Sequence, residues 1–503
     1  MKNMLHLTQT EGLYFMSQIK GEALPRGQLS TLPLVFMIIA ASAPLTVFAG
    51  GTPTNYAVSS LLGVPLAYVA LGVILAFFAV GYGRMASQIH NAGAFYVYIS
   101  RGLGLRQGIG GAIVALVSYN LMQIGLYGLF GFSAAHALAA TLDVHLPWWL
   151  CGGAAWVLVA ILGIRNIDLS AKVLGIVVLT EFLVVTAAAI YALVQAPEGI
   201  TSDGWQPQDF FTPGIGVLLA FSMAAFMGFE SGAIYSEEAK QPERTVPRAT
   251  YIAIAAIAVF YAVSAWSLQI GIGPSSIIDQ SQEFGPDLVF VWLAEVSPAA
   301  ANAAHILFVV SLLAALIAFH NAAARYFFSL GRSTVLPEAL AKTGKTGAPI
   351  AGSLVQSALS VAVVAVFAIV GQSSELGELF PVMTLFTWFT NAAAFGLTFM
   401  IAVTSVAVCV WANREHKEYS FFVRTLAPVL AGVGMTVVTI LILVNFDIMM
   451  DSDNAITVWI MPLIILAAGA VGLIRGQILI NQKSTASHIL SGKPTTSESL
   501  LER

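Results

Sequence analysis

The chain has 503 residues, of which 58% are hydrophobic and only 10% are charged. Soluble globular domains carry about 25% charged residues, so this composition excludes an ordinary soluble enzyme and an intrinsically disordered chain. The net charge of −4 and the scattered Lys and Arg residues offer no basic surface for nucleic acid. The two cysteines offer no disulfide framework and no cysteine-based metal site. The composition therefore predicts an all-α polytopic membrane protein, with the lipid bilayer as its environment.

Twelve apolar segments follow one another along the chain, each close to the roughly 20 residues that a helix needs to cross a bilayer. The polar segment 1–28 before them contains no signal peptide, and the Ser/Thr-rich segment 481–503 after them is predicted to be a disordered cytoplasmic tail. A single membrane domain is thus predicted over 29–480. Its spans are predicted at 31–50, 63–85, 108–136, 147–164, 172–194, 214–236, 248–273, 303–328, 350–370, 381–411, 425–446 and 455–474.

Charged residues divide between the two sides of these spans. If the N-terminus is cytoplasmic, all 22 Lys and Arg residues fall in cytoplasmic loops, tails or helix ends. In the loops on the other side, all charged residues are acidic, among them Asp143, Asp287 and Glu378. Because positive charge accumulates on the cytoplasmic side of membrane proteins, this division predicts an even number of spans with both termini cytoplasmic. The compact loops suit a bacterial inner (plasma) membrane.

Two carboxyl groups are predicted at membrane depth, Glu181 in the fifth span and Glu230 in the sixth. An ionisable group there costs several kcal/mol unless it is paired, protonated or facing water, so both residues are candidates for function. The alternative is a neutral acid that is hydrogen-bonded between helices. His305 and His320 in the eighth span are interpreted as packed side chains. Because no hydrolytic or metal-binding motif accompanies these residues, we predict no enzymatic activity, no cofactor and no metal site.

Two spans contain residues that interrupt helices. The first contains Pro44 and the pair Gly50-Gly51 in ASAPLTVFAGG, and the sixth contains Gly228 and Gly232 in FMGFESGAIY. A helix interrupted at membrane depth is tolerated only where its backbone faces protein or a water-filled cavity. Corresponding interruptions in two halves of a membrane protein indicate the binding site of a transporter. A proline kink and small-residue packing are the alternative explanation.

Three stretches resemble those of amino acid–polyamine–organocation (APC) permeases. They are FMGFESGAIYSEEAKQPERTVPRA at 226–249, AGAFYVYISRGLG at 92–104 and ARYFFSLGRSTVLPEAL at 324–340. The resemblance implies a five-plus-five inverted repeat with interrupted helices one and six. The first repeat would occupy about 31–194 and the second about 214–411, with helices eleven and twelve at about 425–474 outside them.

The resemblance also implies a substrate held between the two interrupted helices. Helix N-termini provide N–H groups that suit a carboxylate, and helix C-termini provide carbonyls that suit an ammonium group. Polar residues of the third span are further candidates, although such residues also bind neighbouring helices together. The implied substrate contacts are Ala43, Pro44, Leu45, Thr46, Tyr119, Asn120, Gln123, Phe226, Met227, Gly228 and Phe229.

The implied function is secondary active transport of amino acids by alternating access. Two departures from many members bear on this function. Pro44 lacks the N–H that small residues offer at this position, which makes an organic amine or polyamine an alternative substrate. Ala224 stands where many members have an aromatic gate, and Phe221 or Phe226 would have to replace it. A passive channel, the remaining alternative, would favour continuous helices with rings of charge. The sequence leaves the oligomeric state open.

Protons are the predicted coupling ion. In sodium-coupled proteins of this architecture, the ion lies between carbonyls of the first span and hydroxyls of the eighth. Here the eighth span reads LLAALIAFHNAAA from Leu312 to Ala324, without Ser or Thr. Glu181 and Glu230 are instead predicted to carry the coupling proton, because burial in an apolar medium favours the neutral form of a carboxyl group.

The division of charge predicts the orientation of the chain. A reporter enzyme that works only in the cytoplasm should be active when fused to the C-terminus, because an even number of spans returns the chain to the cytoplasmic side. A second fusion, to a reporter that works only outside the cytoplasm, should be inactive. Activity of the second fusion alone would contradict the twelve-span topology.

Overall fold

The computed structural model describes residues 29–88, 95–165, 171–230, 232, 239–344, 348–451 and 454–482. This described part is helical and contains no β-strand. The predicted segment 1–28 and most of the predicted tail 481–503 lie outside it. Its longer elements are α2 (Thr31–Ser42), η1 (Thr46–Gly51), α3 (Thr52–Ser59), α4 (Val64–Ala86), α5 (Phe95–Leu103), α6 (Leu105–Leu142), α7 (Trp148–Arg165), α8 (Ala171–Gln195), α10 (Ile215–Phe226), α12 (Pro242–Ile272), α15 (Pro298–Arg332), α16 (Ile350–Val370), η7 (Pro381–Phe386), α17 (Thr387–Glu415), η8 (Phe422–Leu426), α18 (Ala427–Val444) and α20 (Ala455–Asn481).

Shorter elements lie in the connections. They are α9 (Pro207–Phe210), α13 (Ile277–Phe284), η3 (Gly285–Asp287), α14 (Leu288–Ala294), η4 (Glu338–Ala341), η5 (Gly371–Ser373), η6 (Gly377–Leu379) and α19 (Phe446–Met450).

Eleven helices of the described part are long and apolar enough to cross a membrane. Each corresponds to a predicted span, so a polytopic membrane protein is the class that the structure shows. The exception is the predicted sixth span at 214–236. Its described part consists of the shorter apolar helix α10 followed by a turn over 227–230. The number twelve therefore remains a prediction that counts this interrupted segment as a span.

The first helix is longer than predicted. The sequence places its end near Gly50, but the chain stays helical to Ser59 through α2, the π-helical η1 and α3. Gly51 has helical angles (φ −70°, ψ −40°). A Cβ at Gly50 would lie 3.1 Å from the ring of Phe308, so this glycine serves close packing against α15. The prediction that Gly50-Gly51 interrupts the helix was wrong, because both glycines stay helical and Gly50 admits the side chain of a neighbouring helix.

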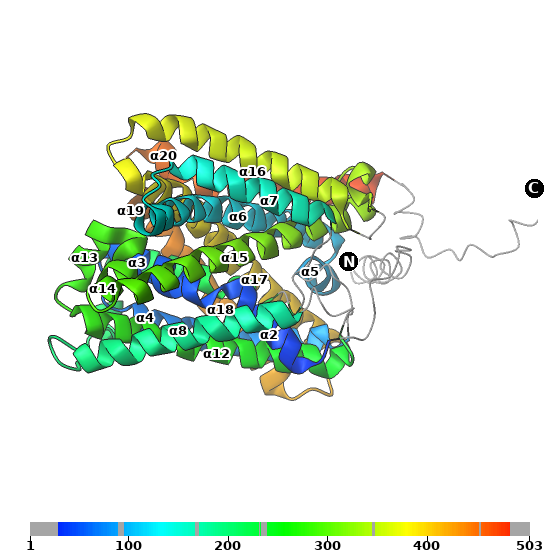
Figure 1. The fold of residues 1–503 in the computed structure, drawn as a ribbon. Coiled ribbons are helices and arrows are strands. Elements are labelled where there is room, and N and C mark those ends of the chain that lie inside the picture. Colours follow the sequence, from blue (N-terminus) through cyan, green and yellow to red (C-terminus); the bar gives the residue numbers. More distant parts are fainter. Residues whose placement is uncertain are drawn as a thin grey trace, which may run out of the picture.

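Eight of the long helices fall into two groups, one of which includes α6. One group contains α6, α7, α15 and α16, and the other contains α2, α4, α8 and α12, each packed internally. Figure 1 shows α16 and α7 on one side of the bundle and α8 and α12 on the other. Over the most apolar 18-residue segment of each helix, 89% of the residues of α6 are buried but only 17% of those in the segment that begins with α16. The bundle therefore has an enclosed centre at α6 and a periphery that faces lipid.

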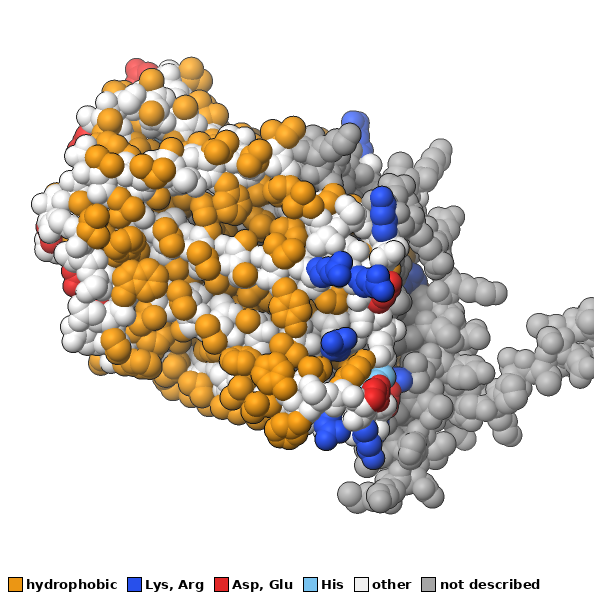
Figure 2. Space-filling model, turned by 90° about the horizontal axis from the view of Figure 1, so that it is seen from below, with side chains coloured by type: hydrophobic (Ala, Val, Ile, Leu, Met, Phe, Trp, Pro, Cys, Tyr) orange, Lys and Arg blue, Asp and Glu red, His pale blue; other side chains and the backbone are white. Residues whose placement is uncertain are grey.

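Exposed side chains follow the same division. Large apolar residues such as Leu183 and Val259 are each 63% exposed on the sides of the bundle. Figure 2 shows an apolar surface with Lys and Arg gathered at one end; acidic residues lie at the opposite end, and some also lie among the basic ones. We call the first the basic end, which includes Arg84, Arg101, Arg332 and Arg414 at helix C-terminal turns. We call the opposite end the acidic end, which includes the connection after α6 with Asp143, the connection after α8 with Glu198, η3 with Asp287 and η6 with Glu378. This arrangement agrees with the charge division read from the sequence.

Close packing of α5 on α17 predicts a destabilising substitution. A Cβ added at Gly102 would lie 2.2 Å from the backbone oxygen of Ala407, whereas one added at Gly153 would have no atom within 4 Å. Overpacking of this kind costs about 1–3 kcal/mol. Gly102→Ala should therefore lower the melting temperature of the purified protein, and Gly153→Ala should leave it unchanged. Equal melting temperatures for the two variants would contradict this packing.

Candidate functional site

The first interruption lies at Ala43. This residue ends α2 in the left-handed conformation (φ 48°, ψ 78°), and its N–H still bonds to the Ile39 carbonyl at 3.0 Å. The conformation costs a non-glycine residue roughly 1–2 kcal/mol. Pro44 then begins the next helical stretch, where its missing N–H removes no helical hydrogen bond. The interruption thus comes one residue before the proline that predicted it.

Glu181 from α8 stabilises this interruption. Its carboxylate accepts the Leu45 N–H at 3.3 Å, and its residue is 2% exposed. Left unpaired in an apolar interior, that N–H would cost about 1–3 kcal/mol. A buried carboxyl group therefore acts as the hydrogen-bond partner of the interrupted first helix.

The second interruption follows α10. Met227 is extended (ψ 131°), and Gly228 has φ +108°, a conformation that favours glycine. The Gly228 N–H donates to the carboxylate of Glu230 at 3.1 Å. The chain therefore leaves the helix at Met227. The next backbone N–H, that of Gly228, finds its hydrogen-bond acceptor in the Glu230 carboxylate two residues along.

Glu230 is fully buried at this second interruption. Its other carboxylate oxygen accepts a hydrogen bond from the hydroxyl of Tyr119 on α6, and its carbonyl accepts one from Tyr82 on α4 at 3.2 Å. The Tyr119 ring packs against Tyr326 on α15, with 5.3 Å between ring centroids. Glu230 therefore links the sixth predicted span directly to α6 and α4, and Tyr119 connects it further to α15.

Hydroxyl groups connect the first interruption to its neighbours. Ser42 donates to the Ala225 carbonyl at 3.0 Å, so it joins the two interrupted segments directly. Tyr261 on α12 donates to the Ser42 carbonyl at 3.2 Å. The hydroxyls of Thr46 and Ser311 on α15 lie 3.0 Å apart. The first interruption is thereby tied to α10, α12 and α15.

A cavity of about 50 Å³ lies between the first interruption and α10, the helix that leads to the second. Among the described residues that line it, none is charged. Its walls come from α2 and η1, α4, α6, α10, α15, η7 and α17. They include Ala41, Ser42, Ala43, Thr46, Tyr68, Met122, Phe221, Ala224, Ala225, Phe319, Phe386 and Thr390. We call this space the central cavity.

Only some of the predicted contacts reach the central cavity in this conformation. Ala43 and Thr46 line it, whereas Pro44 and Leu45 are buried beside it. Of the two proposed aromatic replacements for the gate, Phe221 lines the cavity next to Ala224, and Phe226 does not. Phe226, Met227, Gly228 and Phe229 form the second interruption and are almost completely buried behind the cavity wall.

The polar residues of the third span have separate surroundings. Tyr119 bonds to Glu230, and Asn120 donates to the Leu116 carbonyl of its own helix at 2.7 Å. Gln123 accepts a hydrogen bond from Gln356 on α16 and lies 3.2 Å from Nδ1 of His320 on α15. His320 is also bonded to Ser353 at 2.7 Å, as expected of a packed side chain. Gln123 thus connects α6, α15 and α16 in this conformation.

Sequence reasoning missed Ser311 and Tyr261. The stretch of the eighth span without Ser or Thr begins at Leu312. Ser311, one residue earlier, faces Thr46 at the first interruption. The inference that the eighth span offers no hydroxyl there was therefore wrong. The signal was available in the sequence, because Ser311 lies within the predicted span 303–328. Tyr261 carries no such signal, since its role depends on how α12 is rotated toward α2.

Comparisons with known proteins show the family of the chain. A family model described as amino acid permease matches residues 29–469. The aromatic amino acid transport protein AroP of Salmonella typhimurium is 23% identical over 482 residues, which cover 90% of this chain and 96% of AroP. The low-affinity putrescine importer PlaP of Escherichia coli is 24% identical over 325 residues, which cover 62% of this chain and 68% of PlaP. The histidine permease HisP of Lactococcus lactis is 24% identical over 309 residues, which cover 57% of this chain and 62% of HisP.

A polytopic helical protein with a cavity between two interrupted segments belongs to the class of membrane permeases. The chain belongs to the amino acid permease family, because the family model covers most of its length. The resemblance to APC permeases is thereby confirmed.

Gly228 is the residue whose substitution tests the second interruption most simply. A Cβ there would lie 2.8 Å from the Cβ of Ala41, and the positive φ would be strained. Gly228→Ala should therefore abolish substrate uptake by disturbing the contact between α2 and the turn after α10. The measurement is uptake into cells with equal amounts of protein in the membrane.

A second substitution controls for this effect. Ala41→Gly removes the contacting Cβ, so uptake should partly return in the Gly228→Ala, Ala41→Gly double variant. Near-normal uptake by Gly228→Ala alone would show that this contact does not matter for transport.

Proposed function

We propose that the protein is a secondary active transporter of amino acids that works by alternating access. One observation carries the proposal: the first interruption and α10, the helix that leads to the second, border the same central cavity, and at each interruption a buried carboxylate accepts a backbone N–H. Membership of the amino acid permease family supports it. In this proposal the bundle is a twelve-helix, five-plus-five inverted repeat in a bacterial inner membrane, with both termini cytoplasmic.

The size of the central cavity supports a moving site. Its volume of about 50 Å³ is well below the roughly 300–1,000 Å³ of pockets that hold drug-sized ligands. The helices around it must therefore separate to admit an amino acid. In alternating access, the helices separate toward one membrane face at a time. The hydrogen bonds of Ser42 and Thr46 would break when the helices around the cavity separate and form again when they close.

Glu181 is the proposed site of the coupling proton. Its carboxylate accepts the Leu45 N–H, and protonation would weaken that hydrogen bond by removing the negative charge. Proton binding would thereby change the stability of the first interruption next to the substrate. Glu230 is the second proposed proton site, since it holds the Gly228 N–H in the same way.

Organic amines are the second candidate class of substrate. At the first interruption, the Ala43 N–H bonds to Ile39, Pro44 has no N–H, and the Leu45 N–H bonds to Glu181. These three residues therefore have no free donor for a substrate carboxylate in this conformation. An amine, which needs acceptors, does not require such donors.

Pairs of amino acids and their decarboxylated amines separate the two substrate classes. Proteoliposomes should accumulate one or more amino acids from a panel that pairs histidine with histamine, ornithine with putrescine, and phenylalanine with phenethylamine. Saturable uptake that depends on the substrate carboxylate supports the amino acid proposal. Uptake of the amines alone would contradict it and favour the second candidate.

Glu181→Gln tests proton coupling. Gln keeps a hydrogen-bond acceptor but cannot bind and release a proton, so uptake driven by a pH gradient should fall to background. Exchange of labelled for unlabelled substrate should continue, because it needs no net proton movement. The matched control is Glu198→Gln, since Glu198 follows the same helix but is exposed at the acidic end.

Two results would overturn the proton proposal. One is uphill uptake by Glu181→Gln and Glu230→Gln at the wild-type level. The other is uptake driven by a sodium gradient at fixed pH, for which the hydroxyls of Thr46 and Ser311 would offer oxygen ligands.

A further inference from the structure

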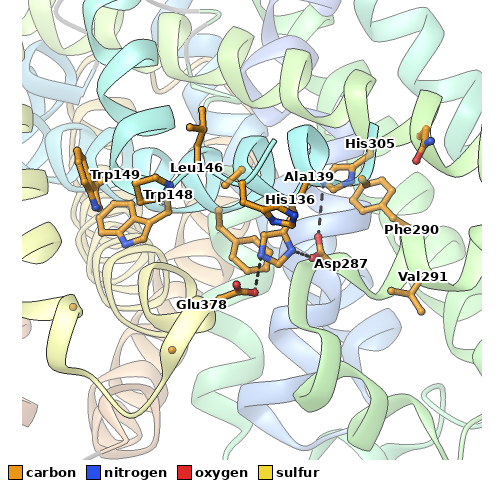
Figure 3. Close-up of a pocket in the computed structure, with 18 of the residues that line it drawn as sticks. His136, Ala139, Leu146, Trp148, Trp149, Asp287, Phe290, Val291, His305 and Glu378 are labelled. Carbon is orange, nitrogen blue, oxygen red and sulfur yellow. Dashed lines mark hydrogen bonds and ion pairs between the residues drawn. The ribbon is translucent and has the colours of Figure 1, made fainter. Parts of the chain in front are cut away.

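A second cavity lies at the acidic end of the bundle. Its volume is about 960 Å³, and it shares no lining residue with the central cavity. It is bordered by the C-terminal part of α6, the start of α7, α14, the start of α15 and the connection between α16 and η7. We call it the outer cavity. Figure 3 shows its aromatic side chains around a group of histidines and carboxylates.

Asp287 lies at the centre of that polar group. One of its oxygens bonds to Nδ1 of His136, whose Nε2 lies 3.4 Å from the carboxylate of Glu378. The other oxygen faces Nε2 of His305 at 3.8 Å, which is too long for a hydrogen bond. Asp287 thus has one satisfied oxygen and one that faces a histidine without bonding to it.

This pair of facing atoms is unusual for its burial. Neither the second Asp287 oxygen nor Nε2 of His305 has a hydrogen-bond partner among the described residues. The side chain of His305 is only 6% exposed, and its ring stacks on Phe290 with 4.2 Å between centroids. His305 is thus packed, as the sequence predicts, but its Nε2 has no hydrogen-bond partner among the described residues. Because unpaired buried polar atoms cost free energy, the pair favours a bound group that supplies the missing hydrogen bonds.

The charge and shape of the outer cavity indicate what that group is. Its described lining contains the carboxylates of Asp287 and Glu378, the histidines His136, His145 and His305, and no Lys or Arg, so with the histidines neutral it favours a cation. Trp148, Trp149 and Phe290 supply aromatic surface on which a ring can stack or a cation can rest. The volume lies within the range of pockets that hold drug-sized molecules.

We propose that the outer cavity binds an organic cation that joins an ammonium group to an aromatic body. The ammonium group donates hydrogen bonds to the carboxylates of Asp287 and Glu378, and the aromatic body packs between the tryptophans and Phe290. Because the outer cavity shares no lining residue with the central cavity, a cation bound there leaves the central cavity unoccupied.

Tryptamine is the probe, because it combines a primary ammonium group with an indole ring. Its radiolabelled form is titrated onto the purified full-length protein, in the wild type and in Gly228→Ala, which disturbs the central interruption. Saturable binding is expected in both. Loss of binding in Gly228→Ala would place tryptamine in the central cavity and overturn the proposal, whatever the uptake assays show.

Substitutions in the outer cavity give the direct test. Asp287→Asn should weaken tryptamine binding at least tenfold, and Glu378→Gln should weaken it severalfold. Glu375→Gln, an acid of the same connection that does not line the cavity, should leave it unchanged. Because the Glu378 side chain is 87% exposed, its substitution remains informative even if Asp287→Asn fails to fold.

The charge of the probe is tested by competition. Indole-3-acetate has the same ring with a carboxylate in place of the amine, so it should not displace tryptamine. Equal displacement by indole-3-acetate and by unlabelled tryptamine would contradict a carboxylate-lined cation site. Unchanged affinity in Glu378→Gln and in a folded Asp287→Asn would do the same.

Discussion

Backbone N–H groups freed by a helix interruption need an acceptor, because an apolar membrane interior provides no water to replace the lost bond. In this protein two buried carboxylates provide it, Glu181 for Leu45 and Glu230 for Gly228. Each acid comes from a different place in the chain. Glu181 reaches the first interruption from α8, whereas Glu230 is part of the second. Each interrupted segment is therefore stabilised by a hydrogen bond to a buried acid next to it.

The same interruptions shape the central cavity. The left-handed turn at Ala43 brings Ser42 against the Ala225 carbonyl, and the π-helical turn that follows brings Thr46 against Ser311. These contacts join α2 and η1 to α10 on one side and to α15 on the other. They also keep the cavity small. A substrate that enters between the interrupted segments must therefore replace hydrogen bonds that the protein makes with itself.

Long apolar segments, charge division and the isolated acids were readable from the sequence because each depends on the chain's local composition. The sixth predicted span also showed its interruption, since Gly228 adopts the positive φ that favours glycine. Gly50-Gly51 misled the prediction because glycine serves helix packing as well as helix interruption. The contacts of Ser311, Gln123 and His305 depend on which helices meet, which one sequence does not determine. The outer cavity was unpredictable for the same reason, as it combines residues from five separate segments.

Solute counterflow in proteoliposomes tests most directly whether one central site serves both sides of the membrane. Vesicles loaded with an unlabelled substrate are diluted into a trace of the same labelled substrate, with no ion gradient. The account predicts a transient accumulation of label above equilibrium in the wild type and none in Gly228→Ala. Label that only equilibrates, at a rate proportional to its concentration, would contradict alternating access and indicate a passive pore.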